Sequence, residues 1–306
     1  MAFTPENIML QDSKTGKIPA EQADLVIKEL IDTSIITQLA KYEEMTKPVK
    51  EFTYLAEGPG AYWVNEAEKI QTDKAKWMQV TMEAKKLGVI LPVSKEFLNY
   101  SVKDFFEKMR PEIVKAFRNK FDAAAIFGTN SPYAKGISLY ERADKAGNKV
   151  ELGTGKTIYE DLNAVMSLVE DGDNEPQAFA TTRKFNKELR GAVDGNLRPI
   201  FNDARDGVTA TALGLPVAYG SKDAWAYDKS LLFTGDFDHS FYGILQNVEY
   251  SISKDATLST ITDDKGEPIN LFERDMFALR ATMHIGFLTV KEDAFAMITP
   301  KAGEGV

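Results

Sequence analysis

Residues 94–128 read SKEFLNYSVKDFFEKMRPEIVKAFRNKFDAAAIFG and contain the strongest helical pattern in the chain. Apolar side chains recur every three or four residues from Val102 to Ala124 on one stripe, which predicts a helix over 102–127 that ends at Gly128. At 1.5 Å per residue such a helix is about 40 Å long. Pro111 lies inside it. Because proline removes one backbone N–H and its ring crowds the preceding turn, we expect a bend at that residue.

The segment before this helix changes to a period of two, which is typical of β-strands. Residues 48–93 contain two alternating runs on either side of a Gly- and Pro-containing breaker at 57–60, and this pattern predicts a long two-stranded ribbon with an extended tip. The outer half carries Tyr62, Trp63 and Trp77. Since a two-stranded ribbon is only marginally stable in water, we expect something outside the ribbon to cover these aromatic side chains.

Residues 157–243 alternate between helical and strand patterns and predict a separate α/β unit. A capping box at 157–160 opens the first predicted helix. The second helix is predicted over 183–193, and strands are predicted over 177–182, 213–219 and 231–233. The chain then returns to β structure. From Phe277 to Phe287 six alternate residues are apolar, and Arg280, Thr282 and His284 occupy the other face of this strand. The fold class is therefore α+β.

The composition excludes several kinds of catalytic and metal-binding site. The 306 residues include no Cys and only two His, so a thiolate nucleophile, a disulfide framework and a Cys- or His-rich metal site are all excluded. We predict no cofactor and no catalytic residue. The formal net charge of −9 opposes tight, sequence-independent capture of nucleic acid. No apolar run approaches the roughly 20 residues of a membrane span, and the first residues lack the pattern of a signal peptide.

Three motifs have a functional and a structural interpretation. GTGKT at 153–157 resembles part of a phosphate-binding loop, but the full spacing requires Gly at position 150, which is Val150, so we favour a turn leading into a helix. His239 follows two aspartates and could act in acid–base catalysis, although a surface histidine is the favoured interpretation. The six acids between Glu160 and Glu175 do not match a calcium loop and are interpreted as a solvated helix end and loop.

Several ordered blocks of the sequence resemble the major capsid proteins of tailed phages of Gram-positive hosts, especially the staphylococcal siphophage type. The blocks are GAYWVNE at 60–66, KLGVILPVSKEFLNY at 86–100, GLPV at 214–217, TGDFD at 234–238 and NLFERDMFALRATMH at 270–284. The resemblance implies the Hong Kong 97-type capsid fold. It assigns an N-terminal arm to 1–47, an E-loop to 48–93, a peripheral domain with a spine helix to 94–156 and 244–306, and an axial domain to 157–243.

The same resemblance implies a structural protein rather than an enzyme, whose copies form hexamers and pentamers of an icosahedral head around double-stranded DNA. It implies assembly in the host cytoplasm, presence in the virion and a portal partner. Only about 47 residues precede the ribbon, so we expect scaffolding to be a separate protein. The candidate residues for contacts between subunits are Tyr62, Trp63, Lys69, Lys74, Trp77, Arg280 and His284.

Two alternatives remain open at this point. A protein nanocompartment that encloses enzymes shares the same fold, and a soluble α+β nucleotide-binding enzyme is a more distant possibility that particle size would distinguish. Some relatives cross-link an E-loop lysine to an asparagine of a neighbouring subunit. Lys69 and Lys74 match by position only, and we do not predict a cross-link.

Overall fold

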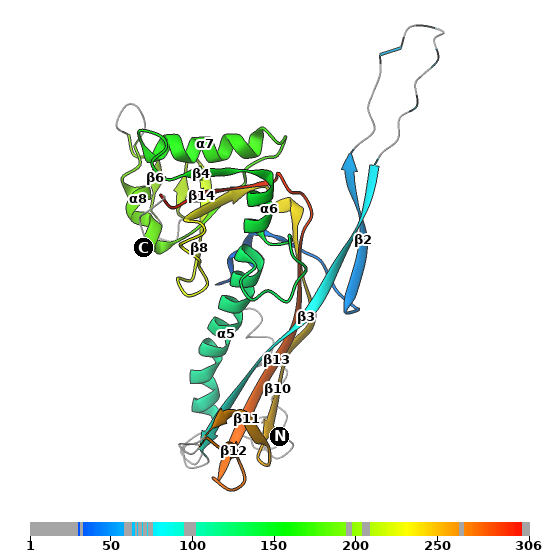
Figure 1. Cartoon of the computed structure of the whole chain (residues 1–306), viewed down its shortest axis with the longest axis vertical. Helices are drawn as coiled ribbons and strands as arrows, with labels where there is room; N and C mark the ends of the chain where they lie inside the picture. Colours follow the sequence, from blue (N-terminus) through cyan, green and yellow to red (C-terminus); the bar gives the residue numbers. More distant parts are fainter. Residues whose placement is uncertain are drawn as a thin grey trace, which may run out of the picture.

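The computed structural model describes residue 30 and residues 33–57, 63–64, 66, 69, 72, 76–94, 102–193, 198–203, 209–262 and 266–301. Figure 1 shows three parts. Helix α5 and the long strands β3, β10 and β13 form an elongated part, a second unit with helix α7 over its sheet lies at one end, and the β2–β3 ribbon projects away from both.

The elongated part is built on a five-stranded sheet in the order β1-β10-β13-β3-β2. Its central strand β13 pairs antiparallel with β3 from Gly286 opposite Ala84 to Met276 opposite Ser94. β3 therefore has two roles, since its first half pairs with β2 and its second half pairs with β13. The strands are β1 Lys41–Tyr42, β2 Val49–Glu57, β3 Lys76–Ser94, β10 Ser240–Ser253 and β13 Met276–Thr289.

The predicted long helix is present as α5 Val102–Phe127, and it continues through Pro111. From Met109 onward its apolar stripe packs on the sheet face that carries the six alternate residues of β13, all of which are buried. Phe121 of α5 meets Phe287 of β13 edge to face, with ring centroids 6.3 Å apart. The predicted helix and strand are both confirmed, and their contact forms the main core of the molecule.

The second unit contains a seven-stranded sheet in the order β4-β14-β9-β5-β8-β7-β6. The strands predicted within 157–243 are present, while β4 and β14, which complete the sheet on one side, come from outside that range. The strands are β4 Lys149–Glu151, β5 Ala178–Thr182, β6 Phe201–Asn202, β7 Thr211–Ala212, β8 Leu215–Gly220, β9 Leu232–Gly235 and β14 Phe295–Thr299.

Helix α7 Ile158–Glu170 covers this sheet and buries Leu162, Val165 and Val169 against it. The second predicted helix is shorter than 183–193, because a 3-10 turn, η1 Arg183–Phe185, precedes a five-residue helix, α8 Asn186–Arg190. The remaining elements connect the two units or extend the long sheet. They are α3 Ile35–Leu39, α6 Leu139–Ala146, η2 Phe237–His239, β11 Thr257–Thr262 and β12 Pro268–Asn270.

A pair of glycines lets the N-terminal part of the chain cross the long sheet. Gly243 of β10 stands opposite Gly286 of β13 in the register. A Cβ atom at Gly243 would lie 2.5 Å from the carbonyl oxygen of Glu43, and one at Gly286 would lie 2.9 Å from Sδ of Met45. The crossing therefore requires the absence of a side chain at Gly243, where a Cβ atom would meet backbone, whereas at Gly286 the Met45 side chain would have to move.

Candidate assembly surfaces

The inner half of the β2–β3 ribbon packs on its own subunit. Phe52 of β2 meets Phe241 of β10 edge to face at 5.2 Å, and Met82 of β3 is completely buried in the same small core. Val80 is partly buried there. The sequence pattern did not indicate this contact, because alternation in one ribbon does not show which other strand lies beneath it.

The outer half of the ribbon leaves this support and exposes large apolar side chains. Trp77 is 63% exposed and Met78 is 44% exposed, and Trp63, near the tip, is fully exposed. Lys69 is also exposed, whereas Tyr62 and Lys74 lie outside the described residues. Trp63 and Trp77 are thus both exposed on an element that extends away from the body of the subunit (Figure 1).

The polar face of β13 forms a second surface. Arg280 is exposed, and its Nε donates to Oγ of Ser251 on the neighbouring strand at 2.9 Å. His284 is half-buried, and its enclosed Nδ1 has no hydrogen-bond partner among the residues that the structure describes. In the register Arg280 faces Ile90 and His284 faces Lys86, so the exposed Ile90 lies beside a basic side chain on this sheet face.

A buried polar contact joins the N-terminal part of the chain to α5. Oγ of Ser34 donates to Oδ1 of Asp122 at 2.6 Å, at the start of α3. Burial raises the pKa of the Asp122 carboxyl to about 6, although the Ser34 hydroxyl and the backbone N–H groups of Ile36 and Ile35 act in the opposite direction. This pair was missed from the sequence, since the two residues are 88 positions apart.

Backbone amides of the GTGKT segment, residues 153–157, donate hydrogen bonds to the chain's own carboxylates. The backbone N–H groups of Gly153 and Gly155 each donate to the Asp161 carboxylate at 2.7 Å, and that of Lys156 donates to Glu160 at 2.7 Å. The amides that would cradle a phosphate are therefore occupied, which supports the turn interpretation. The predicted capping box is wrong, because the Thr157 side chain makes no capping hydrogen bond and Glu160 binds the amide of Lys156 instead.

His239 is half-buried rather than a surface residue, which corrects the favoured interpretation. It lies in η2 with Nε2 3.4 Å from Oδ2 of Asp236. Burial lowers the pKa of His239, and the charge of Asp236 offsets this only in part. Asp236 also accepts a hydrogen bond from Nε2 of Gln177 at 3.0 Å, so Asp236 links the residue before β5 to the turn between β9 and β10.

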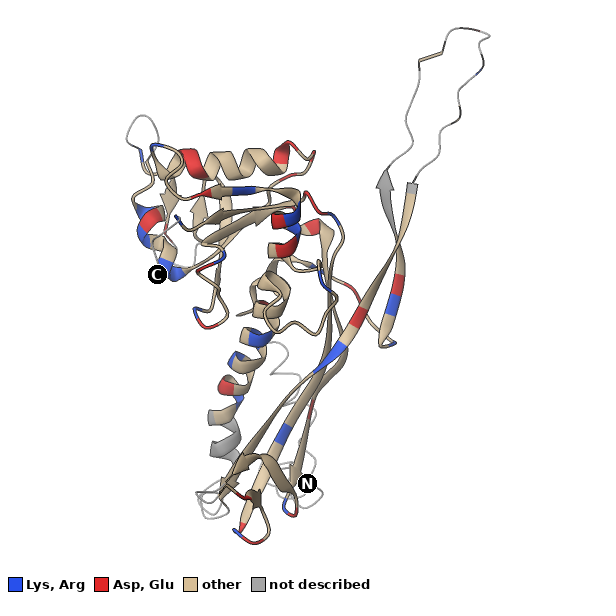
Figure 2. Ribbon diagram, in the orientation of Figure 1, with Lys and Arg blue, Asp and Glu red and all other residues tan. Residues whose placement is uncertain are grey.

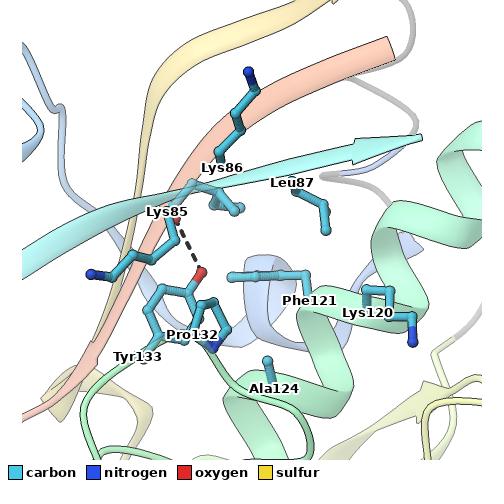
Figure 3. A pocket seen from close by; sticks show the side chains of 9 residues that line it. Lys85, Lys86, Leu87, Lys120, Phe121, Ala124, Pro132 and Tyr133 are labelled. Carbon is cyan, nitrogen blue, oxygen red and sulfur yellow. Dashed lines mark hydrogen bonds between the residues drawn. The ribbon is translucent and has the colours of Figure 1, made fainter. Parts of the chain in front are cut away.

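A small niche lies between α5, β3 and the loop after α5 (Figure 3). Its volume is about 40 Å³, far below the several hundred Å³ of a typical substrate pocket. Tyr133 closes one side and donates to the carbonyl oxygen of Ile285 at 3.1 Å. Within the described residues, no three His, Asp or Glu side chains come close enough to hold a metal ion, and no helix is long and apolar enough to cross a membrane.

Comparisons with known proteins agree with one another. The phage capsid family matches residues 16–299. The chain is 40% identical over 300 residues to the major capsid protein of Staphylococcus phage 80alpha, which covers 97% of this chain and 89% of that protein. Among solved structures, one from Microbacterium phage Oxtober96 is 28% identical with a TM-score of 0.74, covering 88% of this chain and 91% of that chain.

Proposed function

The chain belongs to the phage capsid family, and we propose on this premise that its copies form the hexamers and pentamers of an icosahedral phage head. It is a major capsid protein of a tailed phage with the Hong Kong 97-type fold, a structural protein rather than an enzyme, and a component of the virion that assembles with itself into a shell. A nanocompartment shell is not favoured, because the match to a phage capsid protein covers nearly the whole chain.

The observation that carries the assembly proposal is the exposure of Trp77 and Trp63 on the outer ribbon. Large aromatic side chains that are exposed on a two-stranded ribbon favour aggregation of free subunits. When a neighbouring subunit covers them, their burial stabilises the contact between the two subunits. We assign this part of the ribbon, with Tyr62, to the main contact between subunits. Lys69, Lys74, Arg280 and His284 are further candidate contact residues.

The domain assignment follows the family's organisation. In this proposal residues 1–47 are the N-terminal arm, 48–93 the E-loop, 94–156 with 244–306 the peripheral domain, and 157–243 the axial domain. Because β4 and β14 join the sheet of the second unit, the axial and peripheral parts share a continuous structure rather than a flexible linker. A fixed connection of this kind suits a shell subunit, whose parts must keep their relative positions.

The remaining partners are also proposals. We infer a separate scaffolding protein, a portal and enclosed double-stranded DNA, with assembly in the host cytoplasm. The net charge of −9 supports enclosing DNA without holding it tightly, because a strongly basic lining would bind the packaged polyanion.

The test is deletion of the ribbon tip, residues 65–76. The variant should remain a folded, soluble subunit, because the main core and the core under α7 do not include the tip. It should fail to form closed particles in negative-stain microscopy and should sediment as free subunits or small oligomers when the full chain yields shells. Normal particles from the deletion variant would overturn the role assigned to the ribbon.

A further inference from the structure

Strand β5 joins two segments of opposite charge within the second unit. The loop before it contains Glu170, Asp171, Asp173 and Glu175 with no basic residue among them. The turn and helix after it, η1 and α8, contain Arg183, Lys184, Lys187 and Arg190 with one acid, Glu188. All eight of these acidic-loop and basic-helix residues are exposed.

The basic segment, residues 183–190, is a firmly held surface. Arg183 stacks over the Tyr219 ring at 5.1 Å and Lys184 over the Tyr227 ring at 4.6 Å. Leu189 and Phe185 bury the other side of the segment in the core under α7. No ion pair links Lys187 to another described residue. The helix therefore presents cations outward while its inner face is fixed.

The acidic loop, residues 170–175, is held equally firmly. Asn174 is buried, and its Nδ2 donates to the carbonyl oxygens of Gly172 at 2.9 Å and Asp293 at 3.2 Å. Lys291 donates to Oδ1 of Asn174 at 2.7 Å and to the carbonyl oxygen of Gly172 at 3.1 Å. That lysine holds the loop backbone, and no ion pair within the described residues joins a base to the four loop carboxylates.

The two charged segments lie at opposite ends of the unit. A five-residue strand such as β5, Ala178–Thr182, is about 17 Å long, and the acidic loop precedes it while the basic segment follows it. In Figure 2 the blue bands of α8 lie at one end of the sheet, and red bands lie at the other end, where α7 leads into the acidic loop. At physiological ionic strength charges separated by more than about 8 Å are largely screened, so the two segments do not neutralise each other within one subunit.

We propose that the basic segment of one copy docks on the acidic loop of the next copy, so that the second units join head to tail in a ring. A head-to-tail contact uses two different and complementary surfaces of each subunit, and it closes into a ring when the rotation between copies allows it. The proposal rests on the self-assembly proposed above and names the surfaces that one of its contacts uses. Charge complementarity at such a contact sets which surfaces meet and how fast they associate.

A second copy fits the basic segment better than nucleic acid does. The segment contains Glu188, and Asp203 lies 4.0 Å from Nε of Arg190, so carboxylates are interleaved with its cations. Phosphate-binding surfaces gain affinity from each cation that displaces a counterion, and nearby carboxylates oppose that gain. The acidic loop of each copy supplies negatively charged carboxylates on a fixed backbone, and these carboxylates form no ion pair with another described residue.

The experiment compares four variants of the full chain with the wild type. The first, Lys187→Glu with Arg190→Glu, gives the basic segment a negative net charge. The second, Glu170→Lys with Asp171→Lys and Glu175→Lys, gives the acidic loop a positive net charge. The third combines all five changes and restores complementarity with the signs exchanged. The control, Lys156→Glu with Lys222→Glu, makes the same change in net charge as the first variant at exposed positions outside both segments.

The first and second variants, each of which changes one of the two surfaces and is called a single-face variant, should form at least about tenfold fewer shells than the wild type, as measured by sedimentation at 0.15 M salt. The combined variant should recover most of these shells. The control should assemble like the wild type. An equal mixture of the two single-face variants can alternate around a ring of six but not a ring of five, so it should give hexamers without closed heads. Circular dichroism and thermal unfolding of dispersed subunits establish that each variant folds. If one does not, Lys187→Gln and Glu175→Gln replace it, and a weaker salt dependence of assembly is then expected.

Several results would overturn this inference while leaving the proposed function intact. Single-face variants that form shells like the wild type would do so, as would a combined variant that fails to recover. If the first variant alone formed normal shells that no longer retained DNA, the basic segment would be assigned to nucleic-acid binding instead. If the wild type and the control also form no shells under conditions where the subunit is folded, the assembly function itself fails instead.

Discussion

The outer half of the ribbon and the sheet under α7 are both made of paired strands, but they place their apolar side chains in opposite environments. In the sheet, Phe179, Leu232 and Ile298 are completely buried by their own subunit. On the ribbon, Trp77 and Met78 remain exposed. Burial of apolar area is the main stabilising contribution in folding and in association. The sheet therefore receives this contribution when one chain folds, and the ribbon receives it only when subunits meet.

The largest effect on the stability of the subunit is expected when a buried side chain is removed from the sheet. Phe179→Ala should lower the free energy of unfolding of the dispersed subunit by about 3–5 kcal/mol, because it leaves a cavity in a completely enclosed core. Urea denaturation followed by circular dichroism measures this loss. A subunit that lost less than about 1 kcal/mol would show that the second unit is not self-supporting.

The Asp122 contact tests whether the N-terminal part of the chain is stabilised like the sheet or like the ribbon. The folded-state pKa, about 6, lies above the ordinary value of 3.8 for an aspartate, so the folded state binds the proton more tightly than the unfolded state. The contribution of Asp122 to stability should therefore be largest below about pH 4, fall as the pH rises to about 6, and stay constant above that. The total loss corresponds to about 3 kcal/mol.

Asp122→Asn removes this titration, and its free energy of unfolding should vary less between pH 4.5 and 7.5 than that of the wild type. Asp122→Ala should be destabilised at both pH values, because it also removes the acceptor for the Ser34 hydroxyl. Asp228→Asn, at an exposed position, is the matched control. Identical pH profiles for Asp122→Asn and the wild type would contradict the assignment.

Trp77→Ala examines the ribbon side of the comparison. The dispersed subunit should keep its stability within about 0.5 kcal/mol, since the side chain is mostly exposed. Each contact between subunits should weaken by about 2 kcal/mol, which raises the concentration needed for assembly about thirtyfold. Static light scattering across a dilution series measures this shift. An unfolded subunit, or unchanged assembly, would remove the distinction between the two regions.

Pro111→Ala is expected to act on the shell more than on the subunit. The helix α5 continues through this residue, and a proline there removes one backbone hydrogen bond and crowds the preceding turn. We predict a bend at Pro111 that differs between precursor and mature shells. Replacing it should alter the expansion of shells, followed by small-angle scattering, while the unfolding midpoint of the subunit changes little. Wild-type expansion would argue against the bend.

The smallest effect is expected at Lys156. Its backbone amide is held by Glu160, but its side chain is exposed, so Lys156→Ala should change stability by no more than about 0.5 kcal/mol and leave assembly intact. We also expect no ATP hydrolysis by the wild type. A measured ATPase activity that this substitution abolishes would require a different interpretation of the 153–157 segment.

Local patterns predicted the elements that make local contacts. The helix 102–127 and the alternation of β13 were visible because one face of β13, and one face of the helix from Ile113 onward, is buried. Residues far apart in sequence set the remaining features. The pairing of β14 with β9 and β4, the support of the ribbon by Phe241, and the Ser34–Asp122 contact depend on how chain segments cross in space, and no short-range period encodes that.

The candidate functional residues likewise include some whose environment the sequence predicted and some whose environment it did not. Trp63 and Trp77 could be identified because an aromatic side chain on a ribbon without a second layer has no core to enter. The half-buried state of His239 could not, since it depends on Asp236 and on the packing between β9 and β10. The two charged segments around β5 were visible in the sequence, but their complementarity became clear only with their placement at opposite ends of one strand.

The glycine pair at 243 and 286 also constrains the order in which the subunit folds. The space above the two glycines exists only after β10 and β13 have paired in register, because each strand supplies one of the two glycines. Met45 and Glu43 can settle into it only then, so the N-terminal segment should dock late and open first in native-state hydrogen exchange. A newly made subunit would thus complete its long sheet while the segment leading to the ribbon is still free, which leaves the ribbon's direction to be fixed last.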